Sequence, residues 1–491
     1  MRYLSKCFQV FIGVGALTFV HTCEAQVLTE VVVPGTAGGQ SSVAVGELDG
    51  DSSNGAETVI ATVSGVVSAV RGDGTLLWSV STPNANCPFS PKNDKLFSSP
   101  VIGDLFGNGV PHVVVGYGGF KGKPCDGGVI ALRGSNGATA WNFSIQKWAK
   151  RRGFDAFRNS VYGTPALADV DGDGKLEIGF GAFDRNVYLL NANGSVRWYY
   201  NAADTVFSTP AFANVDSSSS LEMLIGTDIS KNTKISPPTP NGGFLYAFRT
   251  SKPSKGGLRF LFRDIKLQLW RTEFDQVVQS SPVVGELISE SDGDEVVIGT
   301  GCFFPQGGQD RLGKYFRVIS AKTGKVLRTL PVTACAPSTP AIGDVDGDGS
   351  NEVVVTVSGA GSAGGDGASH VIAWKPDIDS VMWDIEPRLA GRRDTFGGHF
   401  NRTPVIADVT GDGRAEVVTS YLSGVVILQG NTGEHLTCDE QPCLKPLLTS
   451  DGPVNGTPRV VDVNSDGRAE ILVAGRKERA PALLKWEGIF K

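Results

Sequence analysis

The segment TPALADVDGDGKLEIGFGAF (residues 164–183) contains the pattern that decides the fold. It begins with a small hydroxyl residue and a proline, and a short apolar run follows that ends at an acid. A tight polar loop then leads into a second apolar run. Apolar runs of this length, bounded by turn residues, are typical of β-strands. The segment therefore predicts two short strands joined by an acidic turn.

The same pattern recurs along the whole chain of 491 residues. Seven other segments repeat the hydroxyl residue, the apolar run and the final acid or asparagine, and all but the first repeat the proline: SSVAVGE (41–47), SSPVIGD (98–104), TPAFAN (209–214), SPVVGE (281–286), TPAIGD (339–344), TPVIAD (403–408) and TPRVVD (457–462). Self-similarity with a period of tens of residues is the signature of repeat architectures. The sequence therefore predicts eight copies of one unit rather than several unrelated domains.

Two further strands complete each unit. In the third unit they are VYLLNA (187–192) and VRWYY (196–200). The fourth strand carries a tryptophan in five of the eight units: Trp78, Trp141, Trp198, Trp270 and Trp383. The second strands are almost continuously apolar, so both of their faces must be covered. Radial stacking of four-stranded sheets achieves this, and we predict an all-β fold, a β-propeller with eight four-stranded blades.

The two ends of the chain determine how such a ring closes. The last unit supplies three clear strands, whereas VLTEVVV (27–33) is a strand with no unit of its own. We predict that this strand completes the eighth blade, so that residues 26–491 form a single propeller domain. A seven-bladed ring with one atypical unit and a solenoid that does not close are the alternatives.

The first 25 residues have the pattern of a secretory signal peptide. Arg2 and Lys6 precede the apolar segment 8–20, and Ala25 offers a cleavage point. The apolar segment is too short to span a bilayer as a helix. We expect removal of residues 1–25 and a secreted protein, extracellular or periplasmic, with no membrane span. The net charge of −6 gives no reason to expect nucleic acid as a partner.

Six cysteines remain after removal of that peptide, and an even number in an exported chain predicts disulfide bonds. Pairing of sequence neighbours is the simplest of the possible connectivities: Cys87–Cys125, Cys302–Cys335 and Cys438–Cys443. No two of the six have CxxC spacing, which argues against zinc binding and redox chemistry.

Four of the acidic loops place oxygen ligands at alternate positions. These positions are Asp169, Asp171, Asp173, Lys175 and Glu177; Asp344, Asp346, Asp348, Ser350 and Glu352; Asp408, Thr410, Asp412, Arg414 and Glu416; and Asp462, Asn464, Asp466, Arg468 and Glu470. Ca²⁺ takes several oxygen ligands, and alternate residues of a tight loop can point inward together. The seventh position of each loop varies in type, as expected if only its backbone carbonyl binds. Turn propensity is the competing explanation, but it does not account for a terminal glutamate four times. We predict Ca²⁺ in these loops.

The other four loops carry fewer oxygen ligands. The loop from Glu47 to Glu57 contains an insertion, and whether it binds calcium is left open. The loops that begin at Asp104, Asn214 and Glu286 have lost ligands or register, and we predict plain turns there.

The DxDGDGxxE-type loops and their TPxxxD lead-ins resemble the FG-GAP/VCBS repeat family, the calcium-loop propellers also found in integrin α-subunit heads. The likeness covers essentially the whole mature chain and implies a propeller that binds calcium. The family includes adhesion and ligand-binding proteins, and its eight-bladed relatives include rhamnogalacturonan lyases. NANGSVRW (191–198), GDGTLLW (72–78) and AKTGKVLRTL (321–330) also resemble, less closely, the tryptophan-docking repeats of quinoprotein propellers.

The long connections are expected on the face opposite the acidic loops, where a ligand would bind. Two connections between blades, 145–161 and 386–402, combine arginine with aromatic residues. Their candidate ligand contacts are Arg151, Arg152, Arg158, Arg392, Arg393 and Arg402. Guanidinium groups recognise carboxylates and sulfates. We predict a non-catalytic binding or adhesion module for an extracellular protein or an acidic glycan.

The alternative function is that of a polysaccharide lyase on the same scaffold. The weak catalytic candidate is His399, which lies near Asp394 in an arginine-rich loop. A histidine so placed could abstract a proton, although a lone loop histidine is more often a surface residue. The motifs GxSxG and HExxH and the phosphate-binding loop are not found. A quinone-dependent dehydrogenase is a third reading, which no cofactor-binding pattern supports.

Overall fold

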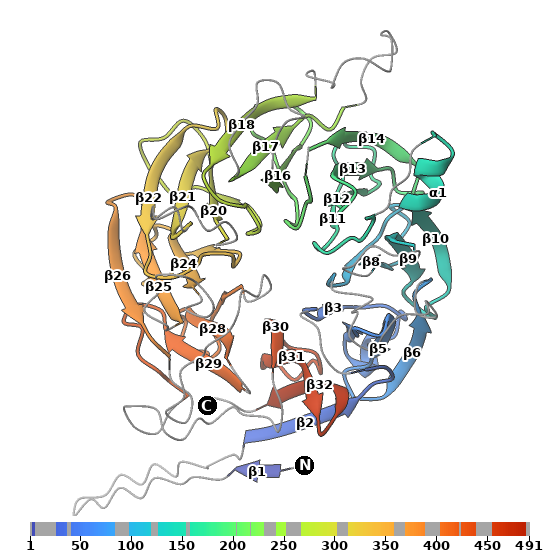
Figure 1. Ribbon diagram of the computed structural model, residues 1–491. Helices are drawn as coiled ribbons and strands as arrows, with labels where there is room; N and C mark the ends of the chain where they lie inside the picture. The colour runs from blue at the N-terminus through green and yellow to red at the C-terminus, as the bar shows by residue number, and fades with distance from the viewer. Residues whose placement is uncertain are drawn as a thin grey trace, which may run out of the picture.

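A computed structural model describes residues 2–4, 26–36, 41–83, 98–118, 126–153, 158–202, 204–216, 218–229, 242–251, 267–301, 313–357, 369–387, 403–421, 424–437 and 454–487. Eight antiparallel sheets surround a central axis (Figure 1). The fold is therefore the predicted all-β propeller, with eight rather than seven blades. Helix within these residues is limited to α1 (Ile145–Lys150) and the 3-10 turn η1 (Ser52–Asn54).

Each blade begins with a short inner strand, and the following strands lie progressively further from the axis. The strands are β3 (Ala44–Gly46), β4 (Glu57–Ala61), β5 (Val66–Val70) and β6 (Leu76–Ser81) in blade 1; β7 (Val101–Gly103), β8 (His112–Tyr117), β9 (Gly128–Arg133) and β10 (Thr139–Ser144) in blade 2; β11 (Ala166–Ala168), β12 (Glu177–Gly181), β13 (Asn186–Leu190) and β14 (Val196–Asn201) in blade 3; and β15 (Ala211–Ala213), β16 (Glu222–Ile229), β17 (Gly242–Phe248) and β18 (Gln268–Phe274) in blade 4.

The second half of the ring repeats this order. Its strands are β19 (Val283–Gly285), β20 (Glu295–Gly299), β21 (Tyr315–Ser320) and β22 (Val326–Pro331) in blade 5; β23 (Ala341–Gly343), β24 (Glu352–Val357), β25 (His370–Lys375) and β26 (Ser380–Ile385) in blade 6; β27 (Val405–Ala407), β28 (Glu416–Tyr421) and β29 (Gly424–Gln429) in blade 7; and β30 (Asn455–Val461), β31 (Glu470–Lys477) and β32 (Ala480–Glu487) in blade 8. In blade 7 the described part of the outer segment makes one bridge, between Leu428 and His435.

The N-terminal strand β2 (Gln26–Val32) closes the ring, as predicted. It pairs antiparallel with β32, from Val27 opposite Glu487 to Val32 opposite Ala482. Figure 1 shows β2 as the outermost strand of the blade built from the C-terminal residues. The short strand β1 (Arg2–Leu4) pairs with β2 and lies within the predicted signal peptide.

The hydroxyl residue of each lead-in has a structural role at the axis. Its side chain accepts a hydrogen bond from the backbone N–H of the corresponding residue in the preceding blade. Five such bonds are seen: Ser42 N to Ser99 Oγ (2.9 Å), Thr164 N to Thr209 Oγ1 (2.9 Å), Thr209 N to Ser281 Oγ (3.0 Å), Thr403 N to Thr457 Oγ1 (3.3 Å) and Thr457 N to Ser42 Oγ (2.8 Å). The last bond joins blade 8 to blade 1.

The fourth-strand tryptophans connect neighbouring blades at the outer rim. Four indole N–H groups donate to a backbone carbonyl of the next blade: Trp78 to Gly134 (2.6 Å), Trp141 to Ala192 (2.9 Å), Trp270 to Ala321 (2.9 Å) and Trp383 to Gly430 (2.7 Å). Each ring also covers a glycine turn. Gly194, for example, has φ 77°, and a Cβ atom there would lie 2.7 Å from the Trp141 ring. The predicted tryptophan docking is thus present.

Trp198 is the exception among the five. Its indole nitrogen is buried and has no hydrogen-bond partner. The corresponding carbonyl in the next blade, that of Thr250, instead accepts a hydrogen bond from Arg197 Nε at 3.0 Å.

The apolar core lies between blades rather than within one. Val113 and Val115 of β8, for example, belong to the same buried cluster as Val59 and Val67 of blade 1. This explains the continuous apolar second strands, because each of these strands packs against sheets on both faces. No helix among the described residues has the length and apolar character needed to cross a membrane.

Candidate metal sites

A buried glutamate begins the second strand in seven of the eight blades. These residues are Glu57, Glu177, Glu222, Glu295, Glu352, Glu416 and Glu470. In each, Oε2 accepts a hydrogen bond of 2.7–3.3 Å from the backbone N–H of the residue that follows the first residue of the loop. All seven side chains are 0–2 % exposed. The bond occurs whether or not the loop is rich in aspartate. One carboxylate oxygen therefore holds the loop, and only Oε1 is available to a cation.

The first aspartate of each of the four loops predicted to bind Ca²⁺ also stabilises the turn. Asp169 accepts the N–H of Gly172 through Oδ1 at 2.7 Å and that of Gly174 through Oδ2 at 2.9 Å. Both glycines have φ between 75° and 79°, a conformation that other residues adopt with difficulty. Asp344 and Asp408 make the same two bonds to their own loops. The repeated GDG pattern is therefore a requirement of the turn as well as a source of ligands.

The loops differ in how closely their acids approach one another. Side-chain oxygens from three residues lie within 4.8 Å of one another in four loops: Asp169, Asp171 and Glu177; Asp344, Asp346 and Asp348; Asp462, Asp466 and Glu470; and Glu47, Asp49 and Glu57. These acidic clusters could bind a metal ion. Three of these clusters lie in loops predicted to bind Ca²⁺, and the fourth lies in the loop from Glu47 to Glu57, which contains an insertion. In the predicted loop 408–416, the acids do not form such a group.

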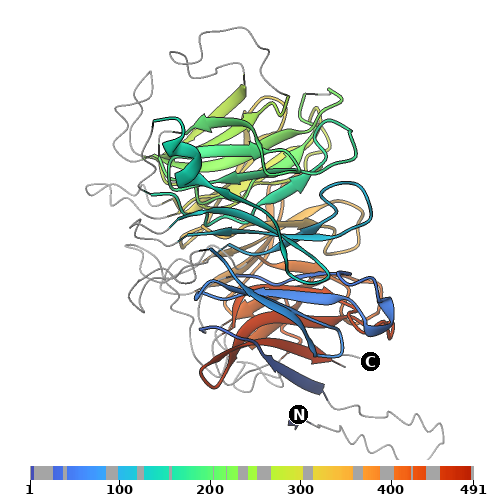
Figure 2. The ribbon, with the colours of Figure 1, turned by 90° about the vertical axis from the view of Figure 1, so that its right-hand side faces the viewer.

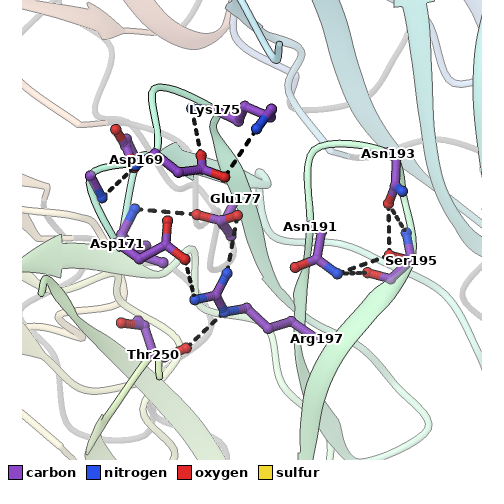
Figure 3. A network of polar contacts seen from close by, with 12 residues as sticks. Asp169, Asp171, Lys175, Glu177, Asn191, Asn193, Ser195, Arg197 and Thr250 are labelled. Atoms are coloured by element: carbon purple, nitrogen blue, oxygen red, sulfur yellow. Dashed lines mark hydrogen bonds and ion pairs between the residues drawn. The ribbon is translucent and has the colours of Figure 1, made fainter. Parts of the chain in front are cut away.

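In blade 3 the guanidinium group of Arg197 contacts two acids of the loop 169–177. Arg197 of β14 contacts Asp171 Oδ2 at 2.6 Å and Glu177 Oε1 at 3.3 Å (Figure 3). Its side chain is 7 % exposed. The same group donates to Thr250 O, so it links the loop to the next blade. Lys175 lies on the other side of the loop, where its ammonium pairs with Asp173 at 3.1 Å.

In blade 6 an ammonium group enters the loop in the same way. Lys375, the last residue of β25, has Nζ 2.6 Å from Asp346 Oδ2 and 3.6 Å from Glu352 Oε1, and it also contacts Asp348. Glu352 Oε1 is buried and has no hydrogen-bond partner. These carboxylates hold the pKa of Lys375 well above its usual value, the hydrogen bond to Asp346 being the main cause.

The sequence analysis missed both bases because they lie outside the loops. A usable signal was strand register: Val353 pairs with Trp374, which places Glu352 opposite Lys375. In blade 7 the residue opposite the buried glutamate, Glu416, is Gln429, which carries no charge. In blade 8 the pairing of Ile471 with Trp486 places Glu487 opposite Glu470. No described basic side chain forms an ion pair with the acids of loops 408–416 and 462–470.

The burial of the glutamates makes these loops favourable for positive charge. Burial raises the pKa of Glu352 and Glu416, and it raises that of Glu470 to about 7. The charges of Asp466 and Asp462 raise the pKa of Glu470 further, while the N–H of Val463 and the charge of Lys485 lower it. A carboxylate in such surroundings is stabilised by a nearby cation, whether a metal ion or a side chain.

The thinner loops are structured without a full set of acids. In blade 2, His112 replaces the buried glutamate, and its ring packs edge-on against Phe106 at 5.2 Å. In blade 5, Asp377 of the neighbouring blade accepts hydrogen bonds from Ser289 in the loop. No cluster of three metal-ligating residues is formed by the described residues of these loops, and the plain turns expected there stay a prediction.

The opposite face is described in part. Lys147 and Lys150 of α1 are exposed, as are Arg151, Arg152 and Arg158 after it. Arg152 stacks on the ring of Trp148 at 4.3 Å. The predicted contacts Arg392, Arg393 and Arg402 and the candidate His399 lie outside the described residues. Cys335 is disulfide-bonded, and the other five cysteines of the predicted pairs lie outside the described residues, so the pairing stays a prediction.

Comparisons with known proteins support the fold but no family. No family model matches the chain, so the FG-GAP/VCBS resemblance is not confirmed beyond the propeller itself, and no curated protein matches it. Among solved structures, the quinohemoprotein alcohol dehydrogenase of Comamonas testosteroni has a TM-score of 0.56 at 12% identity, covering 92% of this chain and 77% of that one. The exotype rhamnogalacturonan lyase YesX has a TM-score of 0.52 at 13% identity, covering 96% and 74%.

BamB from Moraxella catarrhalis is also similar, with a TM-score of 0.49 at 14% identity, and the match covers 94% of this chain and 98% of that one. At such identities a likeness reports only the course of the backbone. The chain is an eight-bladed β-propeller, and these comparisons establish its fold and nothing further.

Proposed function

We propose that this protein is a secreted, calcium-stabilised propeller that binds an acidic glycan without performing chemistry. The observation that carries the proposal is the exposed basic group on and after α1: Lys147, Lys150, Arg151, Arg152 and Arg158. None of these five pairs with a described carboxylate. Guanidinium and ammonium groups left exposed in this way are suited to the carboxylates or sulfates of a polymer.

The basic group rests on a rigid support. Ser144 caps α1 by accepting the N–H of Lys147 at 3.0 Å. Trp148 is buried and packs against Tyr188 and Tyr199 of blade 3, with ring centroids 5.5 Å and 4.8 Å away. The helix that carries Lys147 and Lys150 is therefore anchored on blade 3, which lowers the entropy cost of binding a ligand there.

The basic group and the acidic loops lie on opposite faces. The loops join first to second strands, whereas α1 follows a fourth strand, and alternate ends of antiparallel strands lie at opposite edges. In Figure 2, α1 (teal) is on one side of the ring and η1 of the 47–57 loop (blue) is on the other. A polyanion could bind the basic face without meeting the repulsion of the acidic one.

Calcium is the ion that suits the acidic loops, because their donors are carboxylate oxygens and backbone carbonyls. The clustered acids of loop 462–470, with which no described basic side chain forms an ion pair, support it most directly. We expect Ca²⁺ to raise the melting temperature of metal-stripped protein by several degrees, through binding to the folded state alone. An unchanged melting temperature on adding Ca²⁺ to the stripped protein would contradict the metal part of the proposal.

The glycan proposal is tested by removing charge from one face at a time. Surface plasmon resonance on immobilised uronate and sulfated polymers should show about tenfold weaker binding for Lys150→Gln/Arg151→Gln, since each of the two contacts contributes about 0.7 kcal/mol. The matched control is Lys322→Gln/Lys325→Gln, which removes the same charge from the acidic-loop side and should bind as the parent does. Equal binding by both double variants would refute the glycan site.

The reaction product distinguishes a lyase from a non-catalytic binding protein. Incubation with the same uronate polymers would generate unsaturated sugar ends that absorb in the ultraviolet if the protein were a lyase. We expect no such absorbance. Its appearance, and its loss in His399→Ala, would replace the binding proposal with the enzymatic one.

A further inference from the structure

The acidic loops do not have equal room for a metal ion. In loop 344–352 the ammonium of Lys375 already contacts Asp346, Asp348 and Glu352. The side chain of Lys375 is 19% exposed, and its ammonium lies among the carboxylates of these three residues. It comes from β25, a different strand, and it faces the otherwise unpartnered Oε1 of Glu352. The position that attracts a cation is therefore filled by the protein.

In blade 3 a basic side chain also pairs with the loop acids, but it comes from a different strand of the blade. Asn191 follows β13 at the position that Lys375 holds in blade 6, and it carries no charge. Arg197 of β14 supplies the cation instead, with contacts to Asp171 and Glu177. In both blades a basic side chain from outside the loop therefore contacts the acids at the third and ninth positions, where a metal ion would otherwise bind.

In blade 8 no described basic side chain forms an ion pair with the acids of the loop, and the charge of the buried Lys485 acts on Glu470 only from a distance. Asp462, Asp466 and Glu470 of this loop approach one another as closely as the acids of the other clusters do. The residue opposite Glu470 is Glu487, whose carboxylate pairs with Lys485 at 2.6 Å. Lys485 otherwise donates to Gly72 O of blade 1, and its charge lowers the pKa of Glu470 without a described ion pair between the two side chains.

We infer that Lys375 and Arg197 act as built-in cations that take the place of Ca²⁺ in loops 344–352 and 169–177, and that among the four predicted loops Ca²⁺ binds in 462–470. This inference rests on the proposed calcium binding and refines it. A metal ion could enter loop 344–352 only by displacing the ammonium, because two positive charges a few ångströms apart repel strongly in a partly buried site.

The test measures bound calcium per chain in the full mature protein, by equilibrium dialysis and elemental analysis. Lys375→Met removes the ammonium and keeps the apolar stem, and it should bind one more Ca²⁺ than the parent. The gain should disappear when Asp348→Asn is added. Lys375→Arg retains the charge and should show no gain, as should Lys322→Met, in which an exposed ammonium paired with Asp292 is removed.

A second measurement needs no variant. Crystals of the parent protein soaked in Mn²⁺ should show an anomalous peak at loop 462–470 and none among Asp344, Asp346 and Asp348. A peak at the latter position, or a Lys375→Met variant with unchanged stoichiometry, overturns the inference and leaves calcium binding intact. A third outcome is that Lys375→Met binds one Ca²⁺ while the parent and Asp462→Asn bind none. This outcome would support the role of Lys375 as a built-in cation and would contradict the proposed calcium binding of the parent.

Discussion

At the scale of single residues, the buried glutamate of each loop is expected to matter through its hydrogen bond more than through its charge. Glu222 is a suitable test, because its loop has few acids and its Oε2 still accepts the N–H of Val215 at 3.1 Å. Glu222→Ala leaves this N–H buried and unpaired, and it should cost about 2 kcal/mol of unfolding free energy. Glu222→Gln keeps an acceptor oxygen and should cost far less.

The pH dependence of the Glu222 variants supplies a further check. Burial raises the pKa of Glu222 above its usual value. A group with a raised folded-state pKa contributes stability below its unfolded pKa and loses that contribution as the pH rises through the folded one. The difference in unfolding free energy between the parent and Glu222→Gln should therefore be smallest near neutral pH. Denaturant unfolding at pH 4 and pH 7 measures both differences, and an alanine variant as stable as the glutamine one would contradict the role of the hydrogen bond.

His435 should make the protein less stable in mild acid. Its side chain is buried in blade 7, its Nε2 has no partner, and burial lowers its pKa to about 4. The unfolded chain then binds more protons between pH 6.5 and pH 4, so stability falls as the pH decreases through this window. The loss should approach about 3 kcal/mol at its lower end. His435→Leu, compared with the parent by unfolding at several pH values, should have a flatter profile. Parallel profiles would exclude the effect.

The sequence is informative about these residues where spacing is local. The alternation of acids over nine positions is contained in one turn, so the clusters in blades 3, 6 and 8 could be anticipated. Lys375 and Arg197 could not be, because they lie on other strands than the acids that they contact, Lys375 on the adjacent strand and Arg197 two strands away. Only the pairing of strands brings them into place, and pairing register is set by the packed blade rather than by the neighbouring residues.

At the scale of elements, the tryptophans offer an internal comparison. Trp383 donates its indole N–H to Gly430 O, whereas the indole N–H of Trp198 has no partner, and both rings are buried. Trp383→Phe should cost about 1 kcal/mol more than Trp198→Phe, because it leaves a carbonyl unpaired while the loss of volume is the same. Thermal unfolding of the two variants measures the difference. Equal losses would mean that packing alone holds the blades together.

The element boundaries follow from the chain because the repeat is strict. The [ST]P lead-in predicts the inner strand, and the hydrogen bonds between blades explain its hydroxyl, for example that of Thr209 with Ser281. The helix α1 was not predicted. It has six residues, too few for a helical period to be recognised, and burial of Ile145 and Trp148 against the blades stabilises it rather than local propensity.

At the scale of the whole molecule, eight blades could be counted from the sequence because one unit is repeated eight times. Closure of the ring depends on the strand at 27–33, whose sequence carries no motif of the repeat. Its partner strand is more than 400 residues away along the chain. That partner was found by elimination, since the last unit lacked one strand and the first segment had no unit of its own.

Closure by β2 should therefore be necessary for the stability of the ring. A chain that begins at residue 34 would expose the edge of β32 and the apolar residues that Leu28 and Val31 cover. We expect its melting temperature to fall by about 10 °C or more, with association through the open edge. A synthetic peptide of residues 26–36 should reverse both effects by strand addition.

Two point variants distinguish closure from a general loss of sequence. Val31 packs against the cluster that includes Val33 and Leu483, whereas the neighbouring Val32 is 52% exposed. Alternate residues of a strand face opposite sides, so Val31→Asp places a charge in the core and Val32→Asp places it in water. Val31→Asp should lower the melting temperature towards that of the truncated chain, and Val32→Asp should leave it almost unchanged. A truncated chain as stable as the parent would show that the other seven blades hold the ring without the N-terminal strand.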